Sequence, residues 1–263
     1  MRRPRVLLAS SLIVTAAVGI TACSASTSST TTTVPGIHAD PLARVRASVG
    51  ATEAAGSAHF VTATTTQPVT GSIPATVQHT AGTGDVDFVG PDIELATGAQ
   101  LPNVPHPPVI RVLRIGDSVY VSTAPTGVRW VRSSTLAKNV NYLGALEPAQ
   151  LADTNGPVSV LGTTMVDGRP AIEFAVTMPG GTSTQSGPGG GIQHITVAPF
   201  VAHVWLDGRG RIVQTSATVV VTDIPPPASL GSSPVPITYS STSTATLSRF
   251  GEPVHLSRPV GAG

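Results

Sequence analysis

Short turns of glycine and aspartate constrain the fold of this chain more than any other feature of its sequence. Gly116-Asp117, Asp167-Gly168 and the four residues from Asp207 to Gly210 each separate two runs rich in valine, isoleucine and threonine. Turns of this length and composition between such runs are typical of β-hairpins. The sequence therefore predicts antiparallel strands joined by tight turns. The expected strands cover residues 60–66, 76–88, 93–95, 109–115, 118–123, 127–131, 158–166, 170–177, 192–206, 211–223 and 237–247.

One helix is expected before the first strand. Asp40 is a good N-cap, and Pro41 suits the first helical position. Leu42, Val45 and Val49 then fall on one helical face, at positions i, i+3 and i+7. The predicted helix covers residues 41–55.

Three further segments have less regular patterns. Residues 136–153 contain Leu143, Leu146 and Leu151 among helix formers, interrupted by Gly144 and Pro148, which favours one or two short helices. Residues 179–191 are rich in Gly, Ser and Thr and are expected to form a loop. Two glycines inside the strand at 76–88, Gly82 and Gly84, predict a bulge or bend there.

The order of these elements predicts an α+β fold. A long antiparallel sheet must twist and curl, so we expect a large curved sheet, or half-barrel, with the N-terminal helix and the short helices on its concave face. Only 11% of the residues are charged and 4% are aromatic, which agrees with a β-rich chain. Residues 37–263 are long enough for a single domain with a sizeable core.

The N-terminus has the parts of an export signal. Arg2, Arg3 and Arg5 precede an apolar run at 6–20, and Ile20-Thr21-Ala22 then leads to Cys23, the only cysteine in the chain. This ending resembles the bacterial lipobox, so residues 1–22 are expected to be a signal peptide and Cys23 the acylated first residue. A plain secretion signal or an uncleaved anchor is the alternative, although the run is shorter than the roughly 20 residues of a spanning helix. Residues 23–36 are mostly Ser and Thr and are expected to be a tether.

Composition and spacing exclude several functions. Outside residues 1–22 the chain has 12 basic and 14 acidic residues, and Lys138 is its only lysine, so no basic stripe is available for nucleic acid. No Gly-x-Ser-x-Gly nucleophile motif is present. The seven histidines do not pair at metal-ligand spacing, and a solvated acidic edge explains Asp85, Asp87, Asp92 and Glu94 better than a calcium site. We therefore expect neither an enzyme, nor a metal, nor another cofactor.

Short strand and turn motifs, taken in order, span nearly all of the chain after residue 22. In this order and spacing they resemble the mycobacterial LppX/LprG family of lipoproteins, whose fold is similar to that of the LolA lipoprotein carrier. The motifs are the sequence ending at Cys23, Ser57-Ala58-His59-Phe60, Gly84-Asp85-Val86, the residues from Ile115 to Val121, Trp130, Val166-Asp167-Gly168, Val204-Trp205-Leu206-Asp207 with Gly210-Arg211-Ile212, and Phe250-Gly251-Glu252-Pro253-Val254.

The resemblance implies a half-barrel around an apolar cavity that holds the acyl chains of a lipid or glycolipid. It also implies a carrier on the outer face of an actinobacterial cell membrane, anchored through acylated (palmitate-bearing) Cys23. A membrane transporter is a further expected partner. The expected cavity residues are Leu42, Val45, Val49, Phe60, Val119, Val121, Trp130, Leu143, Leu146, Val204 and Leu206.

Two questions stay open at this point. The first is whether the predicted cavity residues pack in a core or line a cavity, and the sequence does not decide which. The same question applies to Trp205. The segments 136–153 and 179–191 also depart from the family pattern. The alternative to a lipid carrier is therefore a tethered protein-interaction module with a filled core.

Overall fold

Residues rich in valine, isoleucine and threonine build one large antiparallel sheet. The computed structural model describes residues 40–70, 77–100, 109–122, 129–133, 141–186, 192–224 and 236–259. Within them the sheet has 13 strands in the order β6-β5-β4-β3-β2-β1-β13-β12-β11-β8-β7, with β10 beside β12 and β9 beside β10. The strands are β1 (Ser57–Thr70), β2 (Gln78–Asp87), β3 (Asp92–Gln100), β4 (Val109–Ile115), β5 (Ser118–Ser122), β6 (Val131–Ser133), β7 (Val158–Val166), β8 (Arg169–Met178), β9 (Gly181–Ser186), β10 (Ile192–Val197), β11 (Phe200–Leu206), β12 (Ile212–Ile224) and β13 (Ile237–Ser248).

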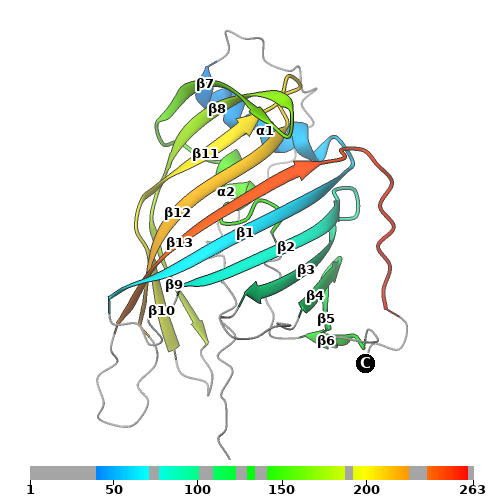
Figure 1. Cartoon of the computed structure of the whole chain (residues 1–263), viewed down its shortest axis with the longest axis vertical. Coiled ribbons are helices and arrows are strands. Elements are labelled where there is room, and N and C mark those ends of the chain that lie inside the picture. Colours follow the sequence, from blue (N-terminus) through cyan, green and yellow to red (C-terminus); the bar gives the residue numbers. More distant parts are fainter. Residues whose placement is uncertain are drawn as a thin grey trace, which may run out of the picture.

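The predicted α+β class and the curved sheet are confirmed. Helices α1 (Pro41–Glu53) and α2 (Pro148–Ala152) lie on the same face of the sheet, behind the strands in Figure 1 and near the end where β8, β11 and β12 meet. We call this face the concave face and the opposite one the outer face. No helix among the described residues is both long and apolar enough to cross a bilayer.

The three predicted hairpins are present. They join β4 to β5, β7 to β8 and β11 to β12. The turn between β7 and β8 has positive φ at both central residues, 48° at Asp167 and 73° at Gly168. Positive φ at both positions belongs to the type I′ turn, whose twist matches that of the strands it joins.

The structure corrects two boundaries near the middle of the chain. Residues 179–191 are not all loop, because Gly181–Ser186 forms β9 and pairs with β10. The expected strand at 192–206 is two strands, β10 and β11, separated by Ala198 and Pro199. Proline has no N–H to donate to a neighbouring strand. The register of pairing with β12 also differs between β10 and β11.

The two glycines of β2 do not form a bulge. The pairing of β2 with β1 runs without a register shift. A Cβ atom at Gly84 would lie 2.6 Å from Cζ of Phe60. It would also collide with the Glu94 carbonyl oxygen of β3, so glycine is needed here because both the neighbouring strand and the Phe60 ring lie too close for a side chain.

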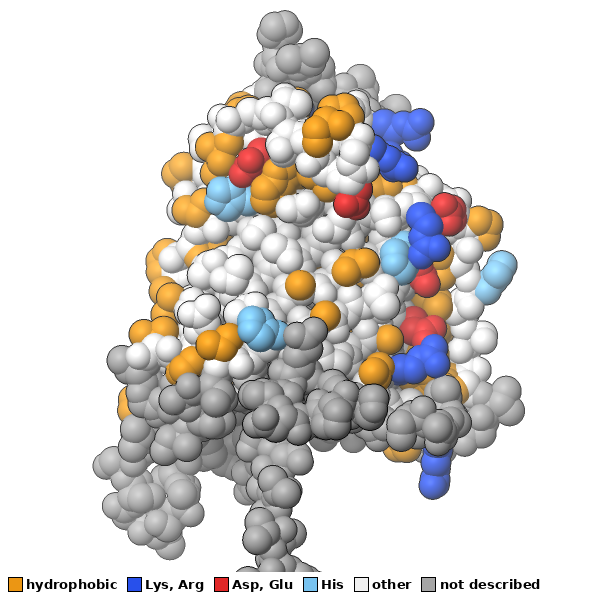
Figure 2. Space-filling view, in the orientation of Figure 1, with side chains coloured by type: hydrophobic (Ala, Val, Ile, Leu, Met, Phe, Trp, Pro, Cys, Tyr) orange, Lys and Arg blue, Asp and Glu red, His pale blue; other side chains and the backbone are white. Residues whose placement is uncertain are grey.

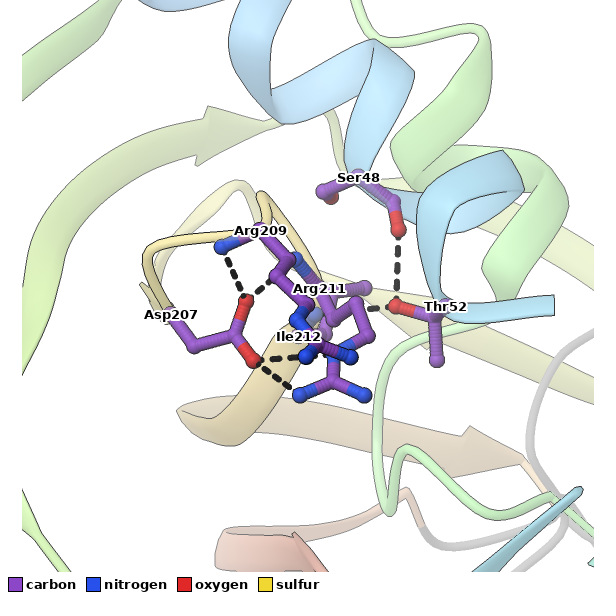
Figure 3. A network of polar contacts seen from close by, with 6 residues as sticks. All are labelled: Ser48, Thr52, Asp207, Arg209, Arg211 and Ile212. Carbon is purple, nitrogen blue, oxygen red and sulfur yellow. Dashed lines mark hydrogen bonds and ion pairs between the residues drawn. The ribbon is translucent and has the colours of Figure 1, made fainter. Parts of the chain in front are cut away.

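Helix α1 begins and docks through polar contacts. The Asp40 carboxylate accepts hydrogen bonds from the N–H groups of Leu42 and Ala43, both at 3.4 Å, which confirms the predicted N-cap. At the other end of α1, Thr52 Oγ1 donates to Ser48 O (2.7 Å) and accepts from the Ile212 N–H at the start of β12 (2.8 Å) (Figure 3).

The turn beside this contact is fixed by one carboxylate. Asp207 accepts hydrogen bonds from the N–H groups of Arg209 (2.9 Å) and Arg211 (3.0 Å), and it forms an ion pair with the Arg211 guanidinium at 2.6 Å (Figure 3). The first residue of β12 is thereby held against the helix.

Candidate functional site

The concave face under α1 is filled by large apolar side chains. Val45 and Val49 of α1 pack in one buried cluster with residues of the sheet and of the segment at 142–151. Seven of the eleven predicted cavity residues belong to this cluster, and none is more than 6% exposed. They are Val45, Val49, Phe60, Leu143, Leu146, Val204 and Leu206.

The other predicted cavity residues lie in different surroundings. On β5, Val119 is buried and Val121 is half-buried. Val119 pairs with Arg114 and Val121 pairs with Val112 of β4, and this register puts both valines on the concave face. Leu42 is half-buried near the start of α1.

Trp130 does not line the concave face. The Arg111 guanidinium lies over the Trp130 ring, 5.7 Å from the ring centre. Arg111 lies on the outer face, where it forms an ion pair with Glu94. Trp130 comes directly before β6, and this contact places its ring beside Arg111 rather than in the buried cluster under α1. Trp205 also lies on the outer face, where it stacks on His203 at 5.9 Å.

The segment at 141–147 rests directly on the floor of the sheet. Thr215 Oγ1 of β12 donates to Leu143 O at 3.0 Å, and the Leu143 N–H donates to the Asn141 side chain at 2.9 Å. Gly144 has φ 67°, and a Cβ atom there would lie 2.6 Å from Ser243 Oγ. This segment therefore covers the middle of the concave face at β12 and β13.

The side chains on the concave face change along the strands. On β13, Leu247, Ala245, Ser243 and Ser241 are buried, whereas Tyr239 is half-buried. On β1 the buried Phe60 is followed at alternate positions by half-buried threonines, and on β12 the buried Ala217 is followed by half-buried Val219. With distance from α1, the large buried side chains thus give way to mostly smaller ones, which are half-buried on β1 and still buried at Ser241 and Ser243 of β13.

Hydroxyl groups of half-buried threonines and buried serines form a row across the centre of this region. Thr64 Oγ1 donates to Ser243 Oγ at 3.2 Å, and the hydroxyls of Thr66 and Ser241 lie 3.3 Å apart. This row was not among the features predicted from the sequence. The signal was the alternation of threonines in β1 and serines in β13, which becomes a shared surface only when the two strands pair.

Aliphatic side chains flank the hydroxyl row on both sides. Leu95 of β3 and Val112 of β4 are half-buried on one side. Val219 and Val221 of β12 lie on the other side. Burial, and to a smaller extent the Asp223 carboxylate, raises the pKa of the Tyr239 phenol, so this phenol stays protonated and able to donate a hydrogen bond.

A group of ionisable residues lies where the segment at 141–147 meets α1. Burial raises the pKa of the Glu147 carboxyl, and the Arg114 guanidinium opposes this shift. Burial also raises the pKa of Glu53 and of Tyr142. Within the described residues, Glu147 Oε1 and the Tyr142 hydroxyl are buried without a hydrogen bond of standard geometry. Tyr142 is held by an edge-to-face contact with Phe88, with ring centres 5.1 Å apart.

The outer face is mostly small and uncharged (Figure 2). His59 is one exception, since its Nδ1 lies 2.8 Å from Asp85 and its Nε2 lies 3.2 Å from Thr83.

A pocket of about 70 Å³ lies among Val166, Val213 and Leu247 and their neighbours, a volume suited to a few water molecules. Within the described part of the chain, no three His, Cys, Asp or Glu side chains lie close enough together to hold a metal ion.

Comparison with known proteins gives structural similarity only. No family model and no curated protein sequence matches this chain. Similar solved structures include lipoprotein LppX from Mycobacterium tuberculosis, at 18% identity and a TM-score of 0.44, covering 82% of this chain and 97% of that one. LprF from Mycobacterium bovis has 15% identity and a TM-score of 0.43, covering 84% and 97%. A LolA superfamily protein from Nitrosomonas europaea has 12% identity and a TM-score of 0.28, covering 79% and 91%.

Proposed function

We propose that this chain is a lipid-anchored protein of the cell envelope that binds the acyl chains of a lipid or glycolipid on its concave face and carries them across the envelope. The observation that supports this function is the change of side chains along the strands. Large buried residues close one end of the concave face under α1, whereas mostly smaller residues, some buried and some half-buried, line the described remainder.

Acyl binding at such a surface needs apolar area and room, but no reactive group. Each methylene that leaves water contributes about 0.8 kcal/mol, so two long chains supply ample affinity. The half-buried Leu95, Val112, Val121 and Val219 offer apolar surface on both flanks of the hydroxyl row. Small side chains such as Thr64 and Ser241 occupy little volume between these flanks.

Two adjacent valines of β12 allow a matched test. Val219 pairs with Ser241 and lies on the concave face, whereas Val220 pairs with Ser240 on the outer face. Val219→Trp should fill the proposed site and lower the amount of co-purifying lipid, measured by mass spectrometry, while the chain stays folded. Val220→Trp should leave the lipid content unchanged. Equal lipid content in the two variants and the parent, or no lipid in the parent, contradicts the carrier function.

One observation favours the alternative, a tethered interaction module. The cluster around Val45, Phe60 and Leu146 is fully buried, as in a filled core. If that packing extends over the whole concave face, Val219→Trp should lower the unfolding midpoint without any change in bound lipid, since overpacking a filled core costs about 1–3 kcal/mol.

Anchoring is proposed through Cys23, which lies outside the described residues. The acylated cysteine would hold the domain at the outer face of the cell membrane. Cys23→Ala should move the protein from the membrane fraction to the soluble fraction. An unchanged distribution, with no lipid mass on the parent chain, contradicts the anchor.

A further inference from the structure

Strand β7 is an exposed apolar edge of the sheet. It closes one end of the strand order and pairs only with β8 among the described residues. Seven consecutive residues of its nine are exposed. Three of these are large and apolar: Val160 is 48% exposed, Leu161 53% and Met165 62%. A long edge strand with exposed apolar side chains normally requires protection from solvent or an occupant.

This apolar strip lies beside the first turns of α1. Val160 pairs with Phe174 of β8, and the Arg44 guanidinium lies 4.9 Å from the centre of the Phe174 ring. Arg46 Nε donates to Thr154 O at 2.6 Å, just before β7 begins. The strip is therefore close to Asp40, where the chain enters the domain from its N-terminal side.

The backbone of β7 is poorly suited to adding another strand. Leu161 is an unpaired extra residue between Val160 and Gly162, and Gly162 has φ 138°. A bulge of this kind interrupts the regular row of N–H and C=O groups that a second strand would need, and it is a common protection of sheet edges. Of the exposed residues, Val160, Leu161 and Met165 carry aliphatic or thioether groups, which suit the apolar boundary of a bilayer, and the others are Ser, Thr or Gly and carry no charge.

The length of the intervening sequence keeps the proposed anchor within reach of this strip. Sixteen residues separate Cys23 from Asp40, and a chain of that length spans at most about 55 Å when fully extended. A tether of this length raises the local concentration of the domain at the membrane to the millimolar range. A surface of three apolar side chains then suffices for contact.

We propose that β7, through Val160, Leu161 and Met165, rests on the surface of the membrane in which Cys23 is anchored. The inference rests on the proposed lipid anchor but not on the proposed cargo. In this orientation the α1 end of the domain faces the lipid bilayer, and the bulged edge is covered by membrane rather than by a second copy.

A nitroxide label tests this contact in the full-length acylated chain, reconstituted in vesicles of phosphatidylcholine and phosphatidylglycerol. Leu161→Cys supplies the labelling site, because the sulfur of an acylated Cys23 does not react. Val201→Cys is the matched control, since Val201 is 48% exposed on the outer face of β11. The ratio of collisions with oxygen to collisions with a water-soluble nickel chelate should be several-fold higher at residue 161 than at residue 201.

Equal ratios at the two positions overturn the proposal. Spectral broadening at residue 161 that grows with the number of chains per vesicle, without a higher oxygen ratio, also overturns it and indicates a second copy as the occupant. Recovery of the chain with the vesicles reports the anchor separately, and a chain that stays in the aqueous fraction overturns both the anchor and the contact.

Discussion

Replacing Thr52 with valine removes a single hydroxyl from the contact between α1 and β12. Thr52 is fully buried, and its Oγ1 accepts the Ile212 N–H at 2.8 Å. Valine has nearly the same shape but no acceptor, so Thr52→Val leaves the Ile212 N–H buried and unpaired. The Ser48 carbonyl loses one hydroxyl donor but, within α1, keeps the helical N–H of residue 52.

The expected loss of stability follows from these contacts. An unpaired buried donor costs about 1–3 kcal/mol. The extra methyl group of valine offsets less than about 0.8 kcal/mol of this, the value for one buried methylene. We therefore expect a decrease of between about 0.2 and 3 kcal/mol in the free energy of unfolding, which for a domain of this size lowers Tm by up to about 12 °C.

Urea unfolding of the chain from residue 23 onward, with Cys23→Ala, measures this difference. Thr52→Ser is the control, because serine keeps the hydroxyl and loses only a methyl group. Equal stability of Thr52→Val and the parent would refute the reasoning. An equal loss in Thr52→Ser and Thr52→Val would also refute it, since the effect would then come from packing and not from the hydrogen bond.

Two further predictions concern the packing on β2 and the buried carboxyl of the 141–147 segment. Gly84→Ala should lower the urea midpoint strongly, because its Cβ would collide with the Glu94 carbonyl oxygen of β3 and with the Phe60 ring, whereas Gly208→Ala, with no atom within 4 Å of the added Cβ, should have a small effect; equal effects contradict the close packing. Burial raises the pKa of Glu147, so its ionised form is disfavoured in the folded state, and the stabilising effect of the protonated form is lost as pH rises above the ordinary value of 4.5. Glu147→Gln should therefore reduce the fall in unfolding free energy between about pH 4.5 and neutrality, and an unchanged pH profile contradicts the burial of this group.

Features set by neighbouring residues were predictable from the sequence. Asp40 and Pro41 define the start of α1, because the N-cap involves only backbone groups two and three residues ahead. Asp167-Gly168 defines a hairpin, because its φ angles are properties of those two residues. The curved antiparallel sheet followed from the repetition of such local signals along the chain.

Features that depend on long-range pairing were decided only by the tertiary structure. Strand β9 forms from a Gly/Ser/Thr segment because β10 lies beside it, and nothing within the segment itself specifies that partner. Trp130 packs on Arg111 and not in the buried cluster under α1, a contact that no local pattern around Trp130 specifies. Gly84 is needed because of a carbonyl oxygen on the paired strand β3 and a ring 24 positions earlier in the chain.

The candidate site divides in the same way. Val45, Val49, Phe60, Leu143 and Leu146 were predictable as inward-facing residues, since apolar side chains leave water in any compact fold. The hydroxyl row exists only because β1 and β13, almost 180 residues apart, pair in one register. The exposed apolar strip of β7 likewise arises because β7 is the last strand of the sheet, a position that its own sequence does not encode. Sequence determines which side chains seek burial, and the tertiary register determines which of them meet.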